Sequence, residues 1–160
     1  MTTDRLTELD DLLAALRLTV QRPGYRRRLL DALEVPGGIT TVRLLRAVET
    51  HSADASPSIS DIATRLAVEH STASRSVDAA VRHGLLSKHT CEHDMRRTRL
   101  KLSARGRSVL SKTSARRKQL LGTVTEGWPD QDLARLITLL DTLLAGFDRL
   151  ESSTSEQRTG

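Results

Sequence analysis

Apolar residues recur at helical spacing near both ends of the chain. Over about residues 3–21 they follow one another at steps of three and four, the stripe of an amphipathic helix: Leu6, Leu9, Leu13, Leu16 and Val20. A wider apolar face covers 130–150, built from Leu133, Leu136, Ile137, Leu140, Leu143, Leu144, Phe147 and Leu150. Another helix is expected over 103–125, with Ser103 as its cap. The pattern predicts long helices that flank the middle of the chain.

The middle of the chain, about 39–102, carries shorter periodic segments. After the break at 36–38, a helix is expected from about Ile39. Ser58 and Asp61 fit the Ser-x-x-acid pattern of a helix start. A further helix follows a tight turn and covers about 70–83, with Gly84 at its end. Two short helices joined in this way indicate a helix-turn-helix.

Strand-like segments come next. We expect strands over 85–89 and 98–102, because Thr98, Leu100 and Leu102 alternate with basic residues. The polar stretch 91–96 would then be the tip of a β-hairpin wing. The predicted fold is mainly α with a small β-hairpin wing: a winged helix-turn-helix head plus a helical dimerisation region, as one domain over 1–151. Residues 152–160 are expected to be disordered.

Composition supports a helical protein. A chain of 160 residues is long enough to bury a core without disulfides. Aromatic residues make up only 2%, so the core must be aliphatic, which favours packed helices over a β-sandwich. The single cysteine, Cys91, excludes an internal disulfide and fits a reducing compartment. Neither a signal pattern nor a membrane-spanning run is present, so we expect a cytoplasmic protein.

Positive charge is concentrated in one part of the chain. Residues 65–118 carry fourteen Lys or Arg against four Asp or Glu, a net charge of +10. The remaining residues carry eleven basic and sixteen acidic side chains, a net charge of −5. This asymmetry indicates a polyanionic partner for one face of the protein.

The helix expected over 70–83 has a small polar face. Thr72, Arg75, Ala79 and Arg82 lie opposite the apolar stripe of Ala73, Val77 and Ala80, with Ser71 on the flank. Small side chains allow a backbone to enter the major groove of DNA, and Arg75 is long enough to reach a guanine edge or a phosphate. Taken alone, this face fits a recognition helix and an ordinary solvated helix surface equally well.

Several short motifs between residues 39 and 110 resemble the multiple-antibiotic-resistance regulator (MarR) family. The most specific is the Asp-x-Arg of Asp94 and Arg96, twelve residues before Gly106. The full set of matching segments is 58–63, 71–75, 84–86, 94–97 and 102–106. Outside these segments, the flanking helices match the family only in their placement.

The resemblance implies a triangular homodimer whose two winged heads bind successive grooves of double-stranded DNA. Arg96 would enter the minor groove, where narrow grooves attract arginine, and Asp94 would hold its side chain. Ser58 and Ser60 near a helix N-terminus would add phosphate contacts. The complete set of candidate DNA-binding residues is Ser58, Ser60, His70, Ser71, Thr72, Arg75, Lys88, Asp94, Arg96 and Arg97.

The function expected from these residues is that of a sequence-specific transcriptional regulator, a repressor acting as a homodimer on a palindromic operator. The resemblance also implies a small-molecule effector, bound between the dimer helices and the head. Two positions depart from the best-known members of the family. Glu69 stands where a capping Ser or Asp is expected, and the first helix has no cysteine, which argues against peroxide sensing by that route.

Other functions are less well supported. The chain has neither a Gly-x-Ser-x-Gly elbow nor a phosphate-binding glycine loop, so we expect no enzyme and no cofactor. Five possible metal ligands lie close in sequence, but their spacing fits no closed zinc motif and no metal is expected: His83, His89, Cys91, Glu92 and His93. A nonspecific architectural DNA binder and a winged-helix protein-interaction module remain as alternatives.

Overall fold

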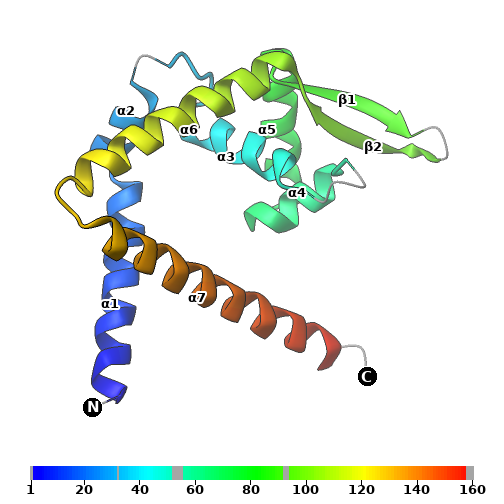
Figure 1. The fold of residues 1–160 in the computed structure, drawn as a ribbon. Coiled ribbons are helices and arrows are strands. Elements are labelled where there is room, and N and C mark those ends of the chain that lie inside the picture. The colour runs from blue at the N-terminus through cyan, green and yellow to red at the C-terminus, as the bar shows by residue number, and fades with distance from the viewer. Residues whose placement is uncertain (1, 32, 52–55, 92–93, 158–160) are drawn as a thin grey trace. The chain divides into compact units, whose positions relative to one another are not determined.

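A computed structural model describes residues 2–31, 33–51, 56–91 and 94–157, with side chains over 4–31, 33–51, 56–89 and 98–150. The elements follow in the order α1 (Thr2–Gln21), α2 (Pro23–Leu30), α3 (Gly38–Glu49), α4 (Ile59–Leu66), α5 (His70–Arg82), β1 (Leu86–Cys91), β2 (Asp94–Leu102), α6 (Ala104–Val124) and α7 (Asp130–Gln157) (Figure 1). This confirms the predicted helical fold with a two-stranded hairpin.

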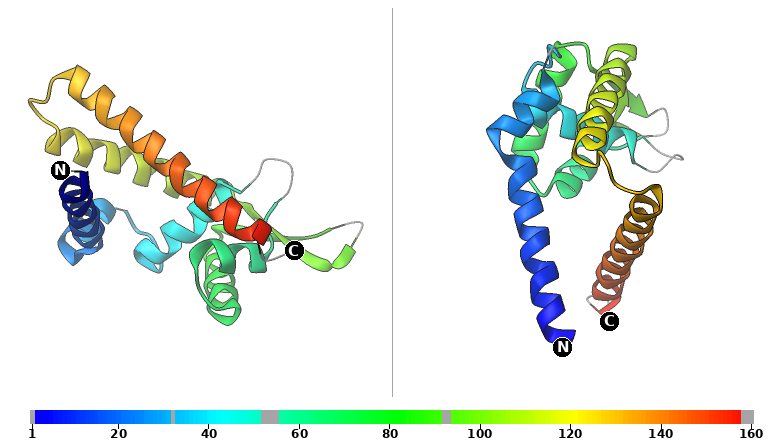
Figure 2. Two further views of the ribbon diagram at one scale, coloured as in Figure 1. Left: turned by 90° about the horizontal axis from the view of Figure 1, so that it is seen from below. Right: turned by 60° about the vertical axis from the view of Figure 1, so that its left-hand side comes forward.

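Contacts divide the chain into two compact units, 1–119 and 120–160. The single domain over 1–151 stays a prediction. Figure 2 gives two further views of the elements, in which α3, α4 and α5 lie together beside the hairpin in the first unit.

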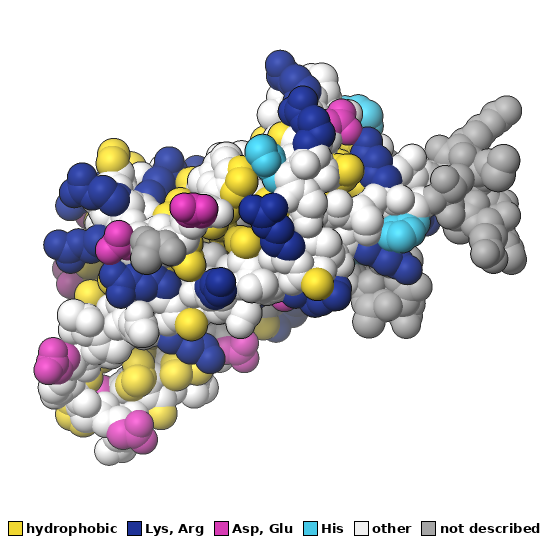
Figure 3. All heavy atoms as spheres, turned by 90° about the horizontal axis from the view of Figure 1, so that it is seen from above, with side chains coloured by type: hydrophobic (Ala, Val, Ile, Leu, Met, Phe, Trp, Pro, Cys, Tyr) yellow, Lys and Arg dark blue, Asp and Glu magenta, His cyan; other side chains and the backbone are white. Residues whose placement is uncertain are grey.

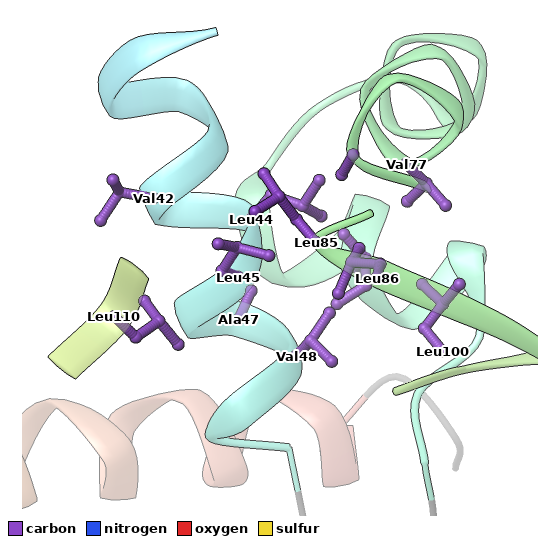
Figure 4. Close-up of a cluster of buried hydrophobic side chains, with 12 residues drawn as sticks. Val42, Leu44, Leu45, Ala47, Val48, Val77, Leu85, Leu86, Leu100 and Leu110 are labelled. Carbon is purple, nitrogen blue, oxygen red and sulfur yellow. The ribbon is translucent and has the colours of Figure 1, made fainter. Parts of the chain in front are cut away.

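The core of the first unit is aliphatic and joins the helices to the wing. Helix α3 is its centre, and Leu45 in α3 and Ile62 in α4 are fully buried. The whole cluster comprises Val42, Leu44, Leu45, Ala47, Val48, Ile62, Val77, Ala80, Leu85, Leu86, Leu100 and Leu110 (Figure 4). Because α3, α4, α5, the hairpin and α6 all contribute to one cluster, burial of apolar surface holds them together.

Helix α4 begins with a complete capping box, as the sequence predicted. The backbone N–H of Asp61 donates to Ser58 Oγ at 3.2 Å, and the backbone N–H of Ser58 donates to Asp61 Oδ2 at 2.8 Å. These hydrogen bonds favour the ionised carboxylate. The backbone N–H and hydroxyl of Ser58, with smaller contributions from the charges of His51 and Arg99, therefore lower the pKa of Asp61 below its ordinary value.

The turn from α4 to α5 is tight and ends without a side-chain cap. Ala67 takes a left-handed conformation with φ of 52°, and the N–H of Val68 bonds back to Ala63 O at 3.0 Å. Glu69, at the N-cap position of α5, makes no side-chain cap hydrogen bond. From there α5 buries the stripe that the sequence predicted: Ala73, Val77 and Ala80.

The backbone between α5 and β1 is packed directly against the start of α6. Gly84 has a φ of +67°, which favours glycine, and Leu85 N bonds to Ala80 O at 2.9 Å. Ser103 donates its N–H to Leu85 O and its hydroxyl to Gly84 O, at 3.1 and 2.6 Å. Gly106 N donates to Ser103 Oγ at 2.9 Å, which confirms the predicted cap. A Cβ at Gly106 would collide with the carbonyl oxygen of Leu85.

The strands of the wing are longer than predicted. Pairing runs from Leu86 opposite Leu102 to Thr90 opposite Thr98, then shifts register so that Cys91 faces Asp94. The expectation of a polar tip over 91–96 is therefore wrong for Cys91 and for 94–96, which lie in strands. The register shift is the physical reason, because it lets the ladder continue almost to the turn.

The terminal helices also differ from expectation in detail. Helix α2 starts at Pro23, a residue that fits the first turn of a helix, so the predicted break separates two helices. Helix α7 continues to Gln157, and the expected disorder of the tail is wrong for 152–157. This stretch contains neither Gly nor Pro to end the helix. Residues 158–160 lie outside the described part.

Large apolar side chains are exposed on α1 and on α7. On α1 they include Leu6, Leu12, Leu16 and Leu18, and on α7 Ile137, Leu139, Leu144, Phe147 and Leu150, all more than half exposed. Across the part of the chain that is described, no helix is both long and apolar enough to span a membrane.

Replacing Gly106 by Ala should destabilise the first unit. The added methyl group would collide with the backbone of Leu85 and press on the side chain of Leu102, and such overpacking costs about 1–3 kcal/mol. Gly122→Ala is the matched control on α6, because an added Cβ there meets nothing within 4 Å. Replacing a glycine inside a helix by alanine should raise the free energy of unfolding by up to about 1 kcal/mol. Urea unfolding measures both. Equal effects would contradict the close packing at Leu85.

Replacing Asp61 by Asn should lower the free energy of unfolding at pH 7 by about 1 kcal/mol, through loss of the capping box. Because the pKa of Asp61 is lower in the folded than in the unfolded protein, its ionisation stabilises the folded state at pH values above the unfolded pKa of about 3.9. This stabilisation is lost as the pH falls through the pKa that Asp61 has in the folded protein. Urea unfolding from pH 7 to pH 2 should therefore show the two proteins converging in acid. Glu69→Gln, without a cap bond, should change stability by less than about 0.5 kcal/mol. If the free energies of unfolding of wild type and Asp61→Asn differed by the same amount down to pH 2, the stabilising role of the Asp61 carboxylate would be contradicted.

Candidate nucleic-acid interface

The outward face of α5 presents the small polar side chains that the sequence singled out. Ser71, Thr72 and Arg75 are exposed, while Ala73 and Val77 on the opposite side are 1% and 0% exposed. Arg75 Nη2 lies 3.4 Å from Thr72 Oγ1, one turn earlier on the same face. The backbone therefore offers a ridge of short side chains with one arginine, as entry into a major groove requires.

A hollow of about 630 Å³ lies beside this helix, at the start of α4. It brings together three of the predicted residues, Ser58, Ser60 and His70, which come from the first turns of α4 and α5 and the residue before α4. The rest of its lining is His51, Ile59, Asp61, Thr98 and Arg99. Two helix starts thus open onto one polar hollow, an arrangement suited to an anion such as a phosphate group.

The two serines differ in their bonding. Ser58 donates its hydroxyl to Asp61 Oδ2 at 2.8 Å and accepts from the N–H of Asp61, so its side chain belongs to the capping box. Ser60 is exposed in the first turn of α4. Asp61, whose pKa is lowered below its ordinary value, carries a negative charge at neutral pH into the same hollow.

Arg99 is a member of this site that sequence reasoning missed. Alternation along β2 placed it on the outer face, but its side chain is only 25% exposed. Its Nη1 donates to Ser56 O at 2.8 Å and lies 3.8 Å from Asp61 Oδ2. Arg99 thereby holds β2 against the segment that leads into α4. The strand pattern gives no signal for this, because the covering segment comes from 43 residues earlier in the chain.

The wing is tied to α5 by an ion pair. Lys88 Nζ on β1 lies 2.6 Å from Asp78 Oδ1 on α5, and both side chains are partly exposed. Lys88, predicted to contact DNA, thus has a partner within the head. Asp94, Arg96 and Arg97 lie on β2, where only their backbone is described. The predicted contact between Asp94 and Arg96 falls outside the described side chains.

The candidate metal ligands do not form a site among the side chains that are described. No three His, Cys, Asp or Glu side chains come together there in a way that would hold a metal ion. His89 Nε2 lies 2.8 Å from Ser87 Oγ, and His83 is exposed at the end of α5. Glu92, His93 and the side chain of Cys91 lie outside the described part.

Figure 3 looks onto the face of α6 and shows Lys and Arg side chains along much of it.

Residues 38–97 match the sequence model of the MarR family. The fold is similar to that of a MarR family protein from Bacillus stearothermophilus, with a TM-score of 0.79 and 18% identity over 92% of this chain and 99% of that one. A mutant of MepR from S. aureus, solved bound to an oligodeoxyribonucleotide, gives a TM-score of 0.60 and 16% identity over 87% and 97% of the two chains. The transcriptional regulator BldR from Sulfolobus solfataricus gives 0.63 and 18% over 89% and 95%.

These likenesses extend over almost the whole chain, and the family match covers α3, α4, α5, β1 and part of β2. At such low identity the solved structures establish the fold, a helical protein with a winged helix-turn-helix. The head of this chain therefore matches the MarR family over residues 38–97, and the fold along its length is similar to that of MarR family proteins.

Proposed function

We propose that this chain is a sequence-specific regulator of transcription that binds double-stranded DNA as a homodimer, acting as a repressor on an inverted repeat. The observation that carries the proposal is the exposed face of α5, where Ser71, Thr72 and Arg75 stand beside the polar hollow at the start of α4. The structural relative MepR, whose mutant was solved bound to an oligodeoxyribonucleotide, supports it.

In this proposal α5 lies in the major groove. The short side chains of Ser71 and Thr72 let its backbone approach the bases, and Arg75 reaches a guanine edge or a phosphate. His70 and Ser60, at the starts of α5 and α4, lie where backbone N–H groups favour a DNA phosphate. Phosphate contacts of this kind position the head, whereas contacts to base edges give specificity.

The wing extends the contact to the neighbouring minor groove. Arg96 inserts there, attracted by the negative potential of a narrow groove, and Asp94 orients it. Arg97 and Lys88 lie near the phosphates. The ion pair between Lys88 and Asp78 links the wing to α5 within the head.

The homodimer is supported by the apolar side chains exposed on α1 and on α7. Side chains such as Leu6 on α1 and Ile137 on α7 are each 60% exposed, and large apolar side chains exposed along a helix are typical of an interaction site. A second copy is the occupant proposed, because two symmetric heads fit a palindromic operator with half-sites about one helical turn apart.

A ligand that changes the separation of the two heads would shift the population away from the DNA-binding state. This is the proposed basis of the response to a small-molecule effector.

Selection of bound fragments from random duplex DNA tests the central proposal. A sequence-specific dimer should recover a palindrome from the pool. A flat pool would favour a nonspecific architectural binder, and failure to bind any duplex in dilute salt would favour a winged-helix protein-interaction module. Salt dependence alone does not separate the first two, because both contact phosphates.

Replacing Arg75 by Ala should weaken binding to the selected duplex by about 1–3 kcal/mol if the arginine reads a base. Binding to unrelated duplexes should change little, because that binding depends on phosphate contacts. Fluorescence anisotropy at fixed salt measures both affinities. Arg135→Ala removes the same charge from α7 and should leave them within about 0.5 kcal/mol. An equal loss on all sequences would reassign Arg75 to the DNA backbone.

Replacing Arg96 by Ala should weaken binding to the selected duplex and leave the dimer intact. Loss of one cation near phosphates should also reduce the slope of log affinity against log salt by about 1. Affinity measured between about 50 and 200 mM salt gives the slope, and sedimentation equilibrium gives the oligomeric state. Unchanged affinity would remove the wing from the proposed interface.

A further inference from the structure

A second hollow, of about 310 Å³, lies between α3, α4 and α6 and is lined by four arginines. Arg43 and Arg46 come from α3, Arg65 from the last turn of α4, and Arg117 from α6. Apolar side chains complete the lining together with Thr50: Val42, Ala47 and Leu66. The hollow lies wholly within the first unit and shares no lining residue with the one beside α5.

The positive charge of this hollow is largely uncompensated. Glu49 Oε2 lies 2.6 Å from Arg46 Nη1 and forms an ion pair with it. The other ion pairs of the described residues, Lys88–Asp78, Arg99–Asp61 and Arg116–Asp31, do not involve Arg43, Arg65 or Arg117. The positive charges of the arginines around one hollow repel each other, and an anion bound between them would replace this repulsion by attraction.

Two of the arginines are held in place by hydrogen bonds. Arg46 Nη2 donates to Ser114 Oγ on α6 at 2.6 Å, which links α3 to α6. Arg65 Nη2 donates to Thr50 Oγ1 at 2.9 Å, and Thr50 Oγ1 donates to Arg46 O at 2.9 Å. The guanidinium groups are thus partly ordered before any ligand arrives, which lowers the entropy that binding must remove.

We infer that this hollow binds a small phosphorylated molecule that carries an apolar group. The planar fork of a guanidinium matches phosphate oxygens in bidentate geometry, and a phosphate ester carries close to two negative charges near neutral pH. A monocarboxylate would balance only one of the unpaired cations. The apolar lining of Val42, Ala47 and Leu66 accepts the uncharged part of the ligand. A volume of about 310 Å³ suits a small molecule.

The position of the hollow suggests what such a ligand would regulate, a step that rests on the proposed DNA-binding function. Leu66 ends α4, and the left-handed Ala67 follows it in the turn into α5. A ligand held by Arg117 on α6 and Arg65 on α4 therefore links α6 to the helix that leads into α5. Such a link changes the affinity for DNA only if it favours one placement of the head.

Calorimetric titration of the full chain, without DNA and at low salt, tests the site directly. Phenyl phosphate is the probe, with benzoate and inorganic phosphate as comparisons that lack the second charge or the apolar group. Phenyl phosphate should bind at least about tenfold more tightly than either comparison, a difference of about 1.4 kcal/mol.

The variants Arg43→Gln and Arg117→Gln, made singly and together, should weaken phenyl phosphate binding, the pair at least about tenfold. Lys118→Gln is the matched control, because it removes the same charge from the neighbouring position on α6 and does not line the hollow. It should stay within about twofold of wild type, as an exposed charge contributes little. Thermal unfolding checks that each variant is folded, and the exposed Arg43 gives a variant that does not disturb the core.

Equal binding by wild type and the double variant would overturn the site, as would no binding of phenyl phosphate at all. Affinity for the selected duplex, measured with and without saturating phenyl phosphate, then tests the regulatory step. A change of less than about twofold would overturn regulation and leave the site standing. If no duplex is bound under any condition, the DNA-binding function fails while the titration still decides the site.

Discussion

Where α5 ends, the chain passes through Gly84 and Leu85, and the first turn of α6 packs directly on that backbone. Gly106 leaves room for the Leu85 carbonyl, while Ser103 bonds to both Gly84 and Leu85. At this one junction the helix that presents Arg75, the wing that carries Arg96 and the helix α6 are fixed to one another. The aliphatic core beneath them supplies most of the stability, but the junction sets their geometry.

A rigid junction has consequences for recognition. In the proposed function, helix and wing reach DNA already placed for adjacent grooves, so little conformational entropy is lost when the head binds. The ion pair between Lys88 and Asp78 and the bracing of β2 by Arg99 act in the same direction. The proposed regulation therefore works on the separation of two preformed heads, and the arginine-lined hollow touches both α6 and the helix that leads into α5.

Local chemistry made much of the head predictable from its sequence. The capping pattern of Ser58 and Asp61 predicted the start of α4, and Ser103 predicted the start of α6. The spacing of Ala73 and Val77 predicted the buried face of α5. These signals are local, because capping and helical periodicity act within a few residues. The register shift in the wing was not predicted, because it arises from the pairing of the two strands. The extension of α7 to Gln157 was not predicted either, because it follows from the lack of a helix-ending residue and not from an apolar pattern. Arg99 and the four-arginine hollow were not predictable, since residues far apart in sequence meet there only after folding.

Hydroxyl-radical footprinting of the protein on its selected duplex tests the rigid, paired heads most directly. Cleavage in the minor groove should be suppressed at two places related by the twofold axis of the palindrome, each beside the major groove that α5 occupies, with the half-sites about one helical turn apart. Protection spread evenly along the duplex, or confined to a single half-site at saturation, would contradict two fixed heads acting together.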